Sequence, residues 1–552
     1  MAVELDLADI QGNILTAYGK EGFPKGRFML FHIEKEKATA GRNFVTGLLP
    51  LITTALRWPS KQHIPTGKIK MDRPKVTVNI AFTWYGLVAL GIPIRTLSGM
   101  PDEFINGMAA RAPMLGDDFK GRKWKDSWDE VWINSGRNWG TDPDTVHILV
   151  TLNAQMNSDG SVVAELEEKT RDIERLCGET GGVRLLTGHN PRGQRTQRFQ
   201  ELSALLGYKS DGTATPLPKE HFGFTDGLGD PVFDGQYPDD HEQFFKIGNG
   251  VLDGNGNWRP LATGEFLLGY PDEAQEIAGA AMPHEFSRNG TFMAYRKLHQ
   301  NVAAFRKFIK ETAQGYARAS GIGNCEDASE ILKAKMAGRW PDGVPTVRAP
   351  AKAEWDAFNK LYPDVDYNVD PAGAAARYAE IAKFTFGDDK EGIRCPLTAH
   401  LRRVNTRDML DPSGGQKGSI LNNRRRILRR GLPYGESPEG TLDEDEHGIV
   451  MLMVCAGLFR QFEFVQQQWI NYGNDSRAGN DTCPIVGNHS DGTGSEHGPK
   501  AKFVIPADPA AGQPPFIVEG LPQFVETRGG EYFFVPSMTA LRMIGMGVVD
   551  PT

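Results

Sequence analysis

The order of apolar and polar residues along the chain predicts a mixture of strands and helices. Residues alternate in polarity, or are rich in β-branched side chains, at 75–84 and 145–154, and both stretches predict strands. Apolar residues then recur at helical spacing over 161–176, which predicts an amphipathic helix. The first third of the chain therefore combines strands with at least one surface helix.

The second half of the chain returns to the same pattern. The predicted elements are strands at 264–270, 290–298 and 449–456, helices at 301–314 and 460–471, and a strand followed by a helix at 531–545. Strands do not alternate strictly with helices, and several lie close enough in sequence to pair locally. The pattern therefore favours an α+β fold with antiparallel sheets over a doubly wound parallel sheet.

Two segments do not fit this pattern. Residues 315–393 are rich in Ala, Pro, Gly and Asp, which predicts a long, partly helical insertion. Residues 473–500 are rich in Gly, Asn, Asp and Ser, which is typical of a loop. At 552 residues the chain also exceeds what one hydrophobic core usually supports, so we expect two domains.

Composition narrows the class of protein. A net charge of −8 argues against a general binder of nucleic acid or of anionic membranes, because both need a broad positive field. No apolar run approaches the roughly 20 residues of a membrane helix. The N-terminal stretch MAVELDLADIQGNILTAYGK lacks the basic and apolar regions of a secretory signal. The five cysteines form no CxxC pair, which is typical of reduced thiols, so we expect a cytoplasmic protein.

One stretch, CPLTAHLRRVNTRD (395–408), places a histidine just before a basic run. It is either a loop with a solvated basic face or a site in which the imidazole of His400 binds a metal. In the second case Arg402 and Arg407 would neutralise carboxylates of the bound group. A haem has both features, because its iron takes a histidine and its two propionates need cations.

Two further stretches carry candidate chemistry. In HFGFTDGLGDPVFDG (221–235), Asp226 is either a turn residue or a carboxylate that a glycine-permitted turn projects into a cavity as a base. In LNNRRRILRRGLPYG (421–435), five arginines within seven residues form either a solvated face or a segment with one inward arginine. Such an arginine would stabilise negative charge on a bound oxygen. The chain has no HExxH, GxSxG, P-loop or Rossmann signature.

Taken together, these stretches resemble the dye-decolorising peroxidases. The resemblance runs in order through DIQGNIL (9–15), GFTDG (223–227), NGTFMAYRKLHQNVAAF (289–305), AKMAGRWPDGVP (334–345), CPLTAHLRRVNTRD (395–408), RRILRRGLPYG (425–435), RQFEFVQQQWIN (460–471) and GGEYFFVPSMTALR (529–542). Because no signal sequence or extended tail is recognised, the chain is expected to be more similar to the larger intracellular bacterial members than to secreted fungal ones.

The resemblance implies two ferredoxin-like α+β halves, each an antiparallel sheet flanked by helices. The expected domains are 1–245, carrying the GxxDG motif, and 246–552, carrying one haem b and the insertion at 315–393. The resemblance makes His400 the proximal ligand of the haem iron and Asp226 the distal acid–base residue.

Four further roles follow from the resemblance. Arg429 would be the distal arginine, with Arg430 as the competing choice. Arg402 and Arg407 would face the haem propionates. The side chains expected to line the distal pocket are those of Leu452 and Val454.

The chain departs from the family pattern near the proximal histidine. In relatives an aspartate just before Pro-Ile often holds this histidine, whereas here the segment reads NDTCPIVG, with Cys483 next to the proline. Either Asp481 reaches the imidazole by a different loop path, or the carboxylate that usually holds this histidine is missing. Loss of that carboxylate would weaken electron donation by the ligand.

The resemblance implies a haem-dependent peroxidase that reduces hydrogen peroxide and oxidises dyes, phenolics or other bulky one-electron donors. It implies neither a nucleic-acid nor a membrane partner, and it leaves the oligomeric state open. A haem-handling protein with little turnover is the alternative; it would need His400 but not Asp226 and Arg429. A cofactor-free interaction protein, docking through 424–430, is a third possibility.

Overall fold

The computed structural model describes residues 3–63, 68–117, 124–133, 144–189, 196–366, 369–411, 420–489 and 501–549. The last part of the loop expected at 473–500 lies outside these ranges. Within the described residues, no helix is both long and apolar enough to cross a membrane.

The N-terminal half is built on a ferredoxin-like βαββαβ unit. Its elements are β1 (Lys25–Ile33), α2 (Ala38–Leu48), β4 (Val76–Phe82), β5 (Ile148–Ala154), α8 (Ala164–Thr180) and β6 (Val183–Leu185). The strands lie in the order β4-β5-β1-β6, and each neighbouring pair is antiparallel. In order of sequence this is the 2-3-1-4 arrangement of a split βαβ fold.

Shorter elements surround this unit. They are α1 (Gly12–Leu15), η1 (Leu49–Leu51), β2 (Ser60–His63), β3 (Lys68–Met71), α3 (Trp84–Ala89), α4 (Ile94–Leu97), α5 (Asp102–Asn106), α6 (Met108–Leu115), η2 (Trp124–Asp126), α7 (Glu130–Ile133), β7 (Gln200–Ser203), β8 (Leu205–Tyr208), β9 (Ala214–Leu217) and α9 (Asp239–Phe245).

The C-terminal half repeats the unit with longer insertions. Its elements are β12 (Thr291–Gln300), α11 (Val302–Ser320), β13 (Leu428–Arg429), β14 (Leu432–Tyr434), β15 (Gly448–Cys455), the π-type helices η5 (Phe459–Glu463) and η6 (Val465–Ile470), and β18 (Val525–Val535). The strand order β13-β15-β12-β18 is again 2-3-1-4. The expectation of two ferredoxin-like halves with antiparallel sheets is therefore confirmed.

The remaining elements lie between and after these strands. They are β10 (Val251–Leu252), β11 (Trp258–Arg259), η4 (Thr263–Glu265), α10 (His284–Ser287), α12 (Cys325–Ala337), α13 (Lys352–Leu361), α14 (Pro371–Ala382), α15 (His400–Val404), α16 (Ile420–Asn423), η7 (Asn474–Ser476), β16 (Lys502–Ile505), β17 (Phe516–Glu519) and α17 (Met538–Met546). The segment 315–393 is thus partly helical, as predicted.

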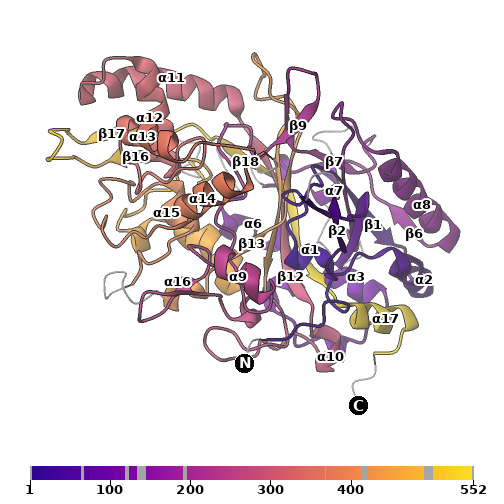
Figure 1. The fold of residues 1–552 in the computed structure, drawn as a ribbon. Helices are drawn as coiled ribbons and strands as arrows, with labels where there is room; N and C mark the ends of the chain where they lie inside the picture. The colour runs from indigo at the N-terminus through magenta and orange to yellow at the C-terminus, as the bar shows by residue number, and fades with distance from the viewer. Residues whose placement is uncertain are drawn as a thin grey trace.

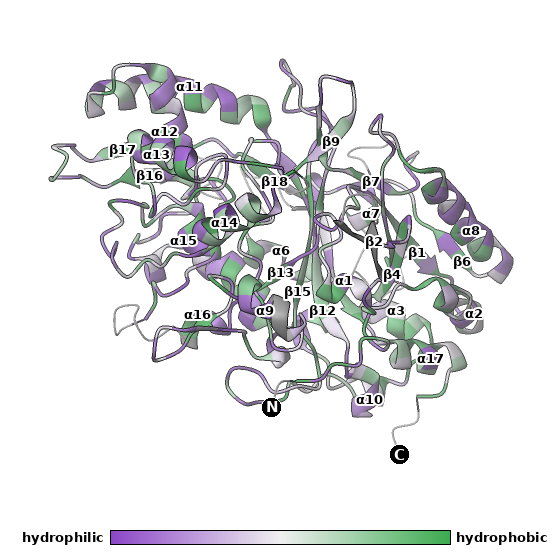
Figure 2. Ribbon diagram, in the orientation of Figure 1, coloured by the Kyte–Doolittle hydropathy of each residue, from purple (hydrophilic) through white to green (hydrophobic). Residues whose placement is uncertain are grey.

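The two halves share one ten-stranded sheet, because β18 pairs with β4 through Phe534 and Phe82. In Figure 1 the helices α2 and α8 lie on one side of the central strands and α11–α15 lie on the other. Helices such as α8 and α11 carry both hydrophilic and hydrophobic residues (Figure 2), as expected for helices that bury one face.

One predicted strand is wrong. Residues 264–270 form the end of η4 and a turn, although their composition predicted a strand. Gly264 N–H donates to the Pro271 carbonyl at 3.0 Å, so the segment folds back on itself. A Cβ on Gly264 would lie 2.2 Å from the Tyr270 carbonyl oxygen, which explains the glycine. The other predicted strands and helices are present within a few residues of their expected bounds.

A buried ion pair ties the two halves together. Lys297 Nζ on β12 lies 2.6 Å from Asp129 Oδ2, and the two side chains are 1% and 0% exposed. Lys297 Nζ also donates to the His189 carbonyl at 2.7 Å. A buried charge without its partner is costly, so each residue depends on the other.

We expect Asp129→Ala to lower the free energy of unfolding by about 3–5 kcal/mol, because Lys297 would keep its charge in the core. Urea unfolding followed by circular dichroism measures the loss. The matched control is the double variant Asp129→Leu/Lys297→Met, which removes both charges and should lose clearly less. An equal or larger loss in the double variant would contradict a role for the ion pair.

Candidate active site

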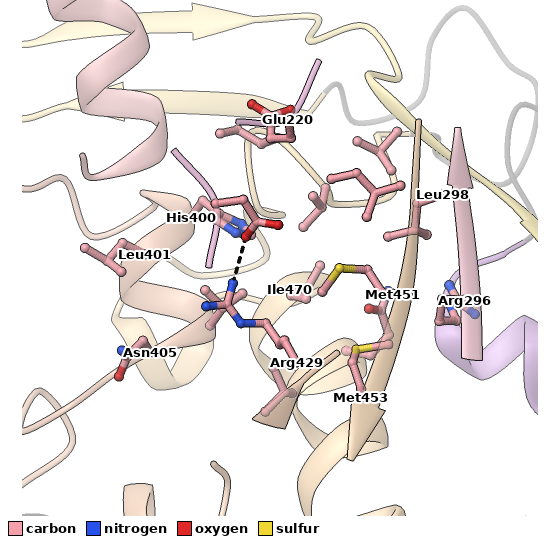
Figure 3. A pocket seen from close by; sticks show the side chains of 18 of the residues that line it. Glu220, Arg296, Leu298, His400, Leu401, Asn405, Arg429, Met451, Met453 and Ile470 are labelled. Carbon is pink, nitrogen blue, oxygen red and sulfur yellow. Dashed lines mark hydrogen bonds and ion pairs between the residues drawn. The ribbon is translucent and has the colours of Figure 1, made fainter. Parts of the chain in front are cut away.

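A cavity of about 320 Å³ lies against the sheet of the C-terminal half. Strands β12, β15 and β18 form one wall, and α15, η5 and η6 contribute residues to another. The N-terminal half reaches the same cavity through the loop 220–231 and through Gly116 and Asp117, which follow α6. Figure 3 shows side chains from both halves converging on this space.

The loop 220–231 presents Asp226 to the cavity. Glycines on either side of the aspartate adopt positive φ angles, +95° at Gly223 and +78° at Gly227, which other residues rarely adopt. Asp226 Oδ1 accepts a hydrogen bond from Gly227 N–H at 2.6 Å. The glycine-permitted turn predicted from the GFTDG motif is therefore present, and the carboxylate borders the cavity.

Glu220 holds the start of this loop. Its two carboxylate oxygens accept hydrogen bonds from Phe222 N–H and Phe224 N–H, both at 2.8 Å, and the Gln300 side chain donates to it as well. Burial raises the pKa of Glu220 to about 7, against the lowering effect of these donors. Sequence reasoning assigned no role to Glu220, although it lies only six positions before Asp226.

Arg429 is the arginine that faces Asp226. Its Nη1 lies 3.3 Å from Asp226 Oδ1, and its Nη2 donates to the Leu228 carbonyl at 2.6 Å. The dashed line that ends on Arg429 in Figure 3 marks the ion pair. Both side chains are about one-third exposed, at 33% and 38%, because they border the cavity.

Arg430 turns the other way. Its guanidinium binds Asp230 Oδ2 at 2.6 Å and donates to the carbonyls of Asn13 and Ile14. These contacts fix the N-terminal segment, and Arg430 does not line the cavity. Residues that follow each other in a strand point to opposite faces, so only one of the two arginines can face Asp226.

His400 begins α15 and borders the cavity from the opposite wall. Its Nδ1 lies 3.3 Å from Cys483 Sγ, so Nε2 is the ring nitrogen available for a ligand. The neighbouring Arg403 anchors the helix by donating to the Trp469 carbonyl at 2.7 Å and to the Tyr472 carbonyl at 3.1 Å. The structure thus brings His400, Asp226 and Arg429 to one cavity.

Arg402 does not occupy its predicted place. Its side chain is fully buried, its Nη2 lies 2.6 Å from Asp389 Oδ2, and its Nε donates to the Cys395 carbonyl. Residues two apart on a helix point in nearly opposite directions, so His400 and Arg402 cannot face one cavity from α15. Arg402 therefore holds the preceding loop in place.

Leu452 and Val454 also differ from the prediction. Both are buried in the sheet core, and the cavity is lined instead by Ile449, Met451 and Met453. The side chains of a strand alternate between two faces. An assignment that is shifted by one residue therefore exchanges the side chains that face the cavity with those that face the core. Figure 3 shows Met451 and Met453 beside Arg429.

Asp481 does not reach the imidazole. Its Oδ1 lies 3.6 Å from Lys502 Nζ, and its backbone N–H donates to the Ala478 carbonyl. Of the two explanations that the sequence left open, the structure supports the second, because no carboxylate of the described residues contacts the His400 imidazole. The side chain that contacts Nδ1 is Cys483.

Two arginines that sequence reasoning missed border the cavity, Arg339 and Arg426. Arg407 lies beside them, with its guanidinium carbon 3.6 Å from the Phe384 ring centroid, whereas that of Arg339 is 5.2 Å from it. Arg407 does not border the main cavity, contrary to the prediction. Arg339 lies within the motif AKMAGRWPDGVP, and Arg426 lies within the arginine run at 424–430. Both motifs were recognised in the sequence, but neither arginine was assigned a role.

These three arginines carry more positive charge than their surroundings balance. Burial, with a smaller contribution from neighbouring Arg429, lowers the pKa of Arg339 and of Arg426 to about 10. Burial likewise lowers the pKa of Arg407, as do Arg339 and Arg426. Among the described residues, Arg407 Nε and Nη2 have no hydrogen-bond partner. Such a cluster favours an anionic group, because buried cations need a partner.

The residues present therefore fit a haem. His400 offers a ring nitrogen to the cavity for iron, and Arg339 and Arg426 offer cations for carboxylates. The apolar residues Ile449, Leu298 and Val525 line the sheet wall, where a flat hydrophobic group would pack. The fold and the cavity define a two-part α+β protein in which a histidine, buried arginines and an apolar wall meet at one cavity.

Comparison with known proteins gives the same class. Residues 9–173 match the DyP dimeric alpha+beta barrel domain. The chain is 28% identical to Peroxidase 2 of Mycetinis scorodonius, with 98% of this chain and 88% of the relative covered. It superposes on the structure of an ancestral D-type dye-decolorising peroxidase with a TM-score of 0.67 and 26% identity, covering 98% and 99% of the two chains. Along nearly its whole length the chain is therefore similar to dye-decolorising peroxidases.

The expected likeness to bacterial members in particular is not supported. Multifunctional dye peroxidase DyP2 of the bacterium Amycolatopsis is 27% identical to this chain. That alignment includes only 59% of this chain and 61% of the relative. The fungal Peroxidase 2, in contrast, aligns along nearly the whole chain. The full-length likeness is therefore to fungal proteins.

We expect Glu220 to make stability depend on pH. The folded state holds its proton longer than the unfolded chain does, since burial raises the pKa from 4.5 to about 7. This contribution to stability is present below pH 4.5 and is lost as the pH rises through about 7. Thermal unfolding between these pH values should show a decline that is weaker in Glu220→Gln. The exposed Glu439→Gln is the control, and an equal decline in all three proteins would contradict the assignment.

Proposed function

We propose that this chain is a haem-dependent peroxidase that reduces hydrogen peroxide and oxidises dyes, phenolics or other bulky one-electron donors. The observation that supports it most is the Asp226–Arg429 pair, which faces the same cavity as His400. A carboxylate and a guanidinium in contact can move a proton and stabilise negative charge at one place. The likeness to peroxidase relatives agrees with this proposal.

In this proposal His400 Nε2 is the proximal ligand of the haem iron. Arg339 and Arg426 bind the propionates, and Arg407 adds positive charge behind them. The haem is haem b, held without covalent attachment, because the chain has no CxxCH sequence. When bound, the haem supplies the redox chemistry, while the protein supplies orientation and charge.

The distal residues act on hydrogen peroxide. Asp226 accepts a proton from one peroxide oxygen through a carboxylate oxygen and returns it to the other, so that water can leave. Arg429 donates hydrogen bonds to the oxygen that becomes negative as the O–O bond breaks. The Leu228 carbonyl fixes Nη2 of Arg429, which leaves Nη1 for Asp226 and the substrate.

The reductants are proposed from relatives. One structure of a dye-decolorising peroxidase that is 25% identical to this chain is a complex with 2,6-dimethoxyphenol. We propose small phenols and anthraquinone dyes as electron donors of this chain. Large dyes would donate electrons at the protein surface, since the cavity is bounded by both halves of the chain.

Each of the two proposed domains contributes different residues to this site. We propose that residues 1–245 form the domain that supplies Asp226, and that 246–552 form the haem-binding domain, with the insertion at 315–393. The boundary falls at the end of α9 (Asp239–Phe245). The insertion contributes Arg339 and Trp340 to the cavity, so it belongs to the cofactor site as well.

A haem-handling protein without turnover is the alternative function. It would require His400 and cations for propionates, but no acid–base pair on the opposite side. The contact between Asp226 and Arg429 favours the enzyme. We also propose a cytoplasmic location, supported by five cysteines that are all unpaired. Cell fractionation of the source organism tests it.

We expect His400→Ala to abolish or greatly weaken haem binding while the chain still folds, because the variant lacks the ring nitrogen that binds iron. The measurement is the Soret absorbance per protein after purification with added haem, together with circular dichroism. The exposed His284→Ala is the matched control. A variant that kept the Soret band of the wild type would remove His400 from the site.

We expect Arg429→Leu to slow the reaction with hydrogen peroxide by about 10²–10³-fold at nearly normal haem content. Stopped-flow absorbance gives the rate, and peroxide-dependent bleaching of an anthraquinone dye should fall with it. Arg430→Leu is the control; it should destabilise the fold through Asp230 and leave the rate per haem nearly unchanged. If Arg429→Leu reacted with peroxide at the normal rate and Arg430→Leu reacted much more slowly, Arg430 would be the arginine that stabilises the negative charge.

A further inference from the structure

A cysteine, rather than a carboxylate, contacts the proposed iron ligand. Cys483 Sγ lies 3.3 Å from His400 Nδ1, and the cysteine is fully buried. A sulfur at this distance is within hydrogen-bonding range of a ring N–H, since bonds to sulfur are longer than bonds to oxygen or nitrogen.

The backbone around Cys483 fixes the position of this sulfur. Cys483 N–H donates to the Ile470 carbonyl at 2.7 Å, and the Cys483 carbonyl accepts from Gly487 N–H at 3.0 Å and bonds with His489 Nε2 at 2.8 Å. A Cβ on Gly487 would lie 2.6 Å from the Cys483 carbonyl oxygen. The turn therefore requires a glycine and holds Cys483 against η6.

The helix that carries His400 is tied to the same segment as Cys483. Arg403 donates to the carbonyls of Trp469 and Tyr472, which ties α15 to η6 and to the residues just after it. Cys483 binds Ile470 in the same segment. His400 and Cys483 are thus both fixed to one stretch, so their contact is part of the packed structure.

The carboxylate of Asp481, which the sequence offered as a partner for His400, contacts a lysine instead. Asp481 Oδ1 lies 3.6 Å from Lys502 Nζ; burial raises the pKa of Asp481, and the charge of Lys502 opposes this rise. No contact joins Asp481 to the imidazole among the described residues. The acceptor available to Nδ1 is therefore the sulfur.

We propose that Cys483 is a positioning residue for the proximal ligand: its sulfur accepts the hydrogen bond from His400 Nδ1–H and directs the Nε2 lone pair toward the cavity. A neutral imidazole has one N–H, so a proton held at Nδ1 leaves Nε2 free to bind iron. The inference rests on the proposed haem site and deepens it.

The chemical consequence concerns how strongly the ligand donates electrons. A hydrogen bond to a partner on the far nitrogen raises the basicity of a metal-bound imidazole, and a carboxylate does so more than a neutral acceptor. Sulfur is a weak acceptor. Cys483 therefore gives His400 its orientation with less anionic character than an aspartate would give it.

The test compares Cys483→Ala, Cys483→Ser and Cys483→Asp in the haem-loaded protein, with Asp481→Asn as the matched control. The readouts are the iron–histidine stretching band of the ferrous protein, measured by resonance Raman spectroscopy, and titration of the apo-protein with haem. We expect the band to move to lower frequency in Cys483→Ala and to higher frequency in Cys483→Asp. Haem affinity should fall by about 10–100-fold in Cys483→Ala. Asp481→Asn should match the wild type.

A band unchanged in Cys483→Ala, or one that moves equally in Asp481→Asn, would overturn the inference. If Cys483→Ala does not fold, Cys483→Ser decides, because the smaller oxygen acceptor keeps the packing but should still shift the band. Failure of the haem site itself gives a different result, in which the wild type binds no haem or His400→Ala binds it normally. A purely structural role for Cys483 would change stability without moving the band.

Discussion

The carboxylate of Asp230 joins three segments that lie far apart in the sequence. It accepts from the backbone N–H of Arg429 at 3.0 Å and binds Arg430 Nη1 at 2.6 Å, and Arg430 reaches on to the carbonyl of Asn13. Burial alone would raise its pKa, yet the charges of Arg430, Lys20 and Arg429 hold the pKa below its usual value. Asp230 thus holds Arg430 inside the protein, while the preceding residue, Arg429, borders the cavity. The distal pair depends on this arrangement.

A cluster of buried arginines lies at the edge of the same cavity and just behind it. Arg339, Arg407 and Arg426 are buried close to one another, and burial together with mutual repulsion disfavours their charged forms. Such a cluster is unfavourable unless an anion completes it. A bound dianionic cofactor would therefore contribute to the stability of the fold as well as to its chemistry. Binding of this kind stabilises the native state by mass action.

The two faces of the site are organised by different means. Asp226 is held by a glycine-permitted turn and by Arg429, while Glu220 fixes the start of the same loop through backbone N–H groups. His400 is held by a short helix, and the group at its far nitrogen is a sulfur. The acid–base side thus follows the family pattern that the sequence displays, and the proximal side departs from it. In our proposal this departure changes how strongly His400 donates electrons and leaves the ligand itself the same.

The sequence alone predicted the order of the elements, the antiparallel α+β class, the likeness to dye-decolorising peroxidases and three residues that border the cavity, Asp226, His400 and Arg429. These follow from local patterns and from motifs whose residues are close in sequence. Tertiary structure decided which side chains of these segments point into the cavity. It selected Met451 and Met453 over Leu452 and Val454, because strand register is set by pairing with β12. It placed Arg339 and Arg426, rather than Arg402, at the cavity, and Cys483, rather than Asp481, at the imidazole. The direction of a side chain depends on contacts with other segments, such as the one that brings Cys483 to His400 across 83 residues, and no local pattern encodes those contacts.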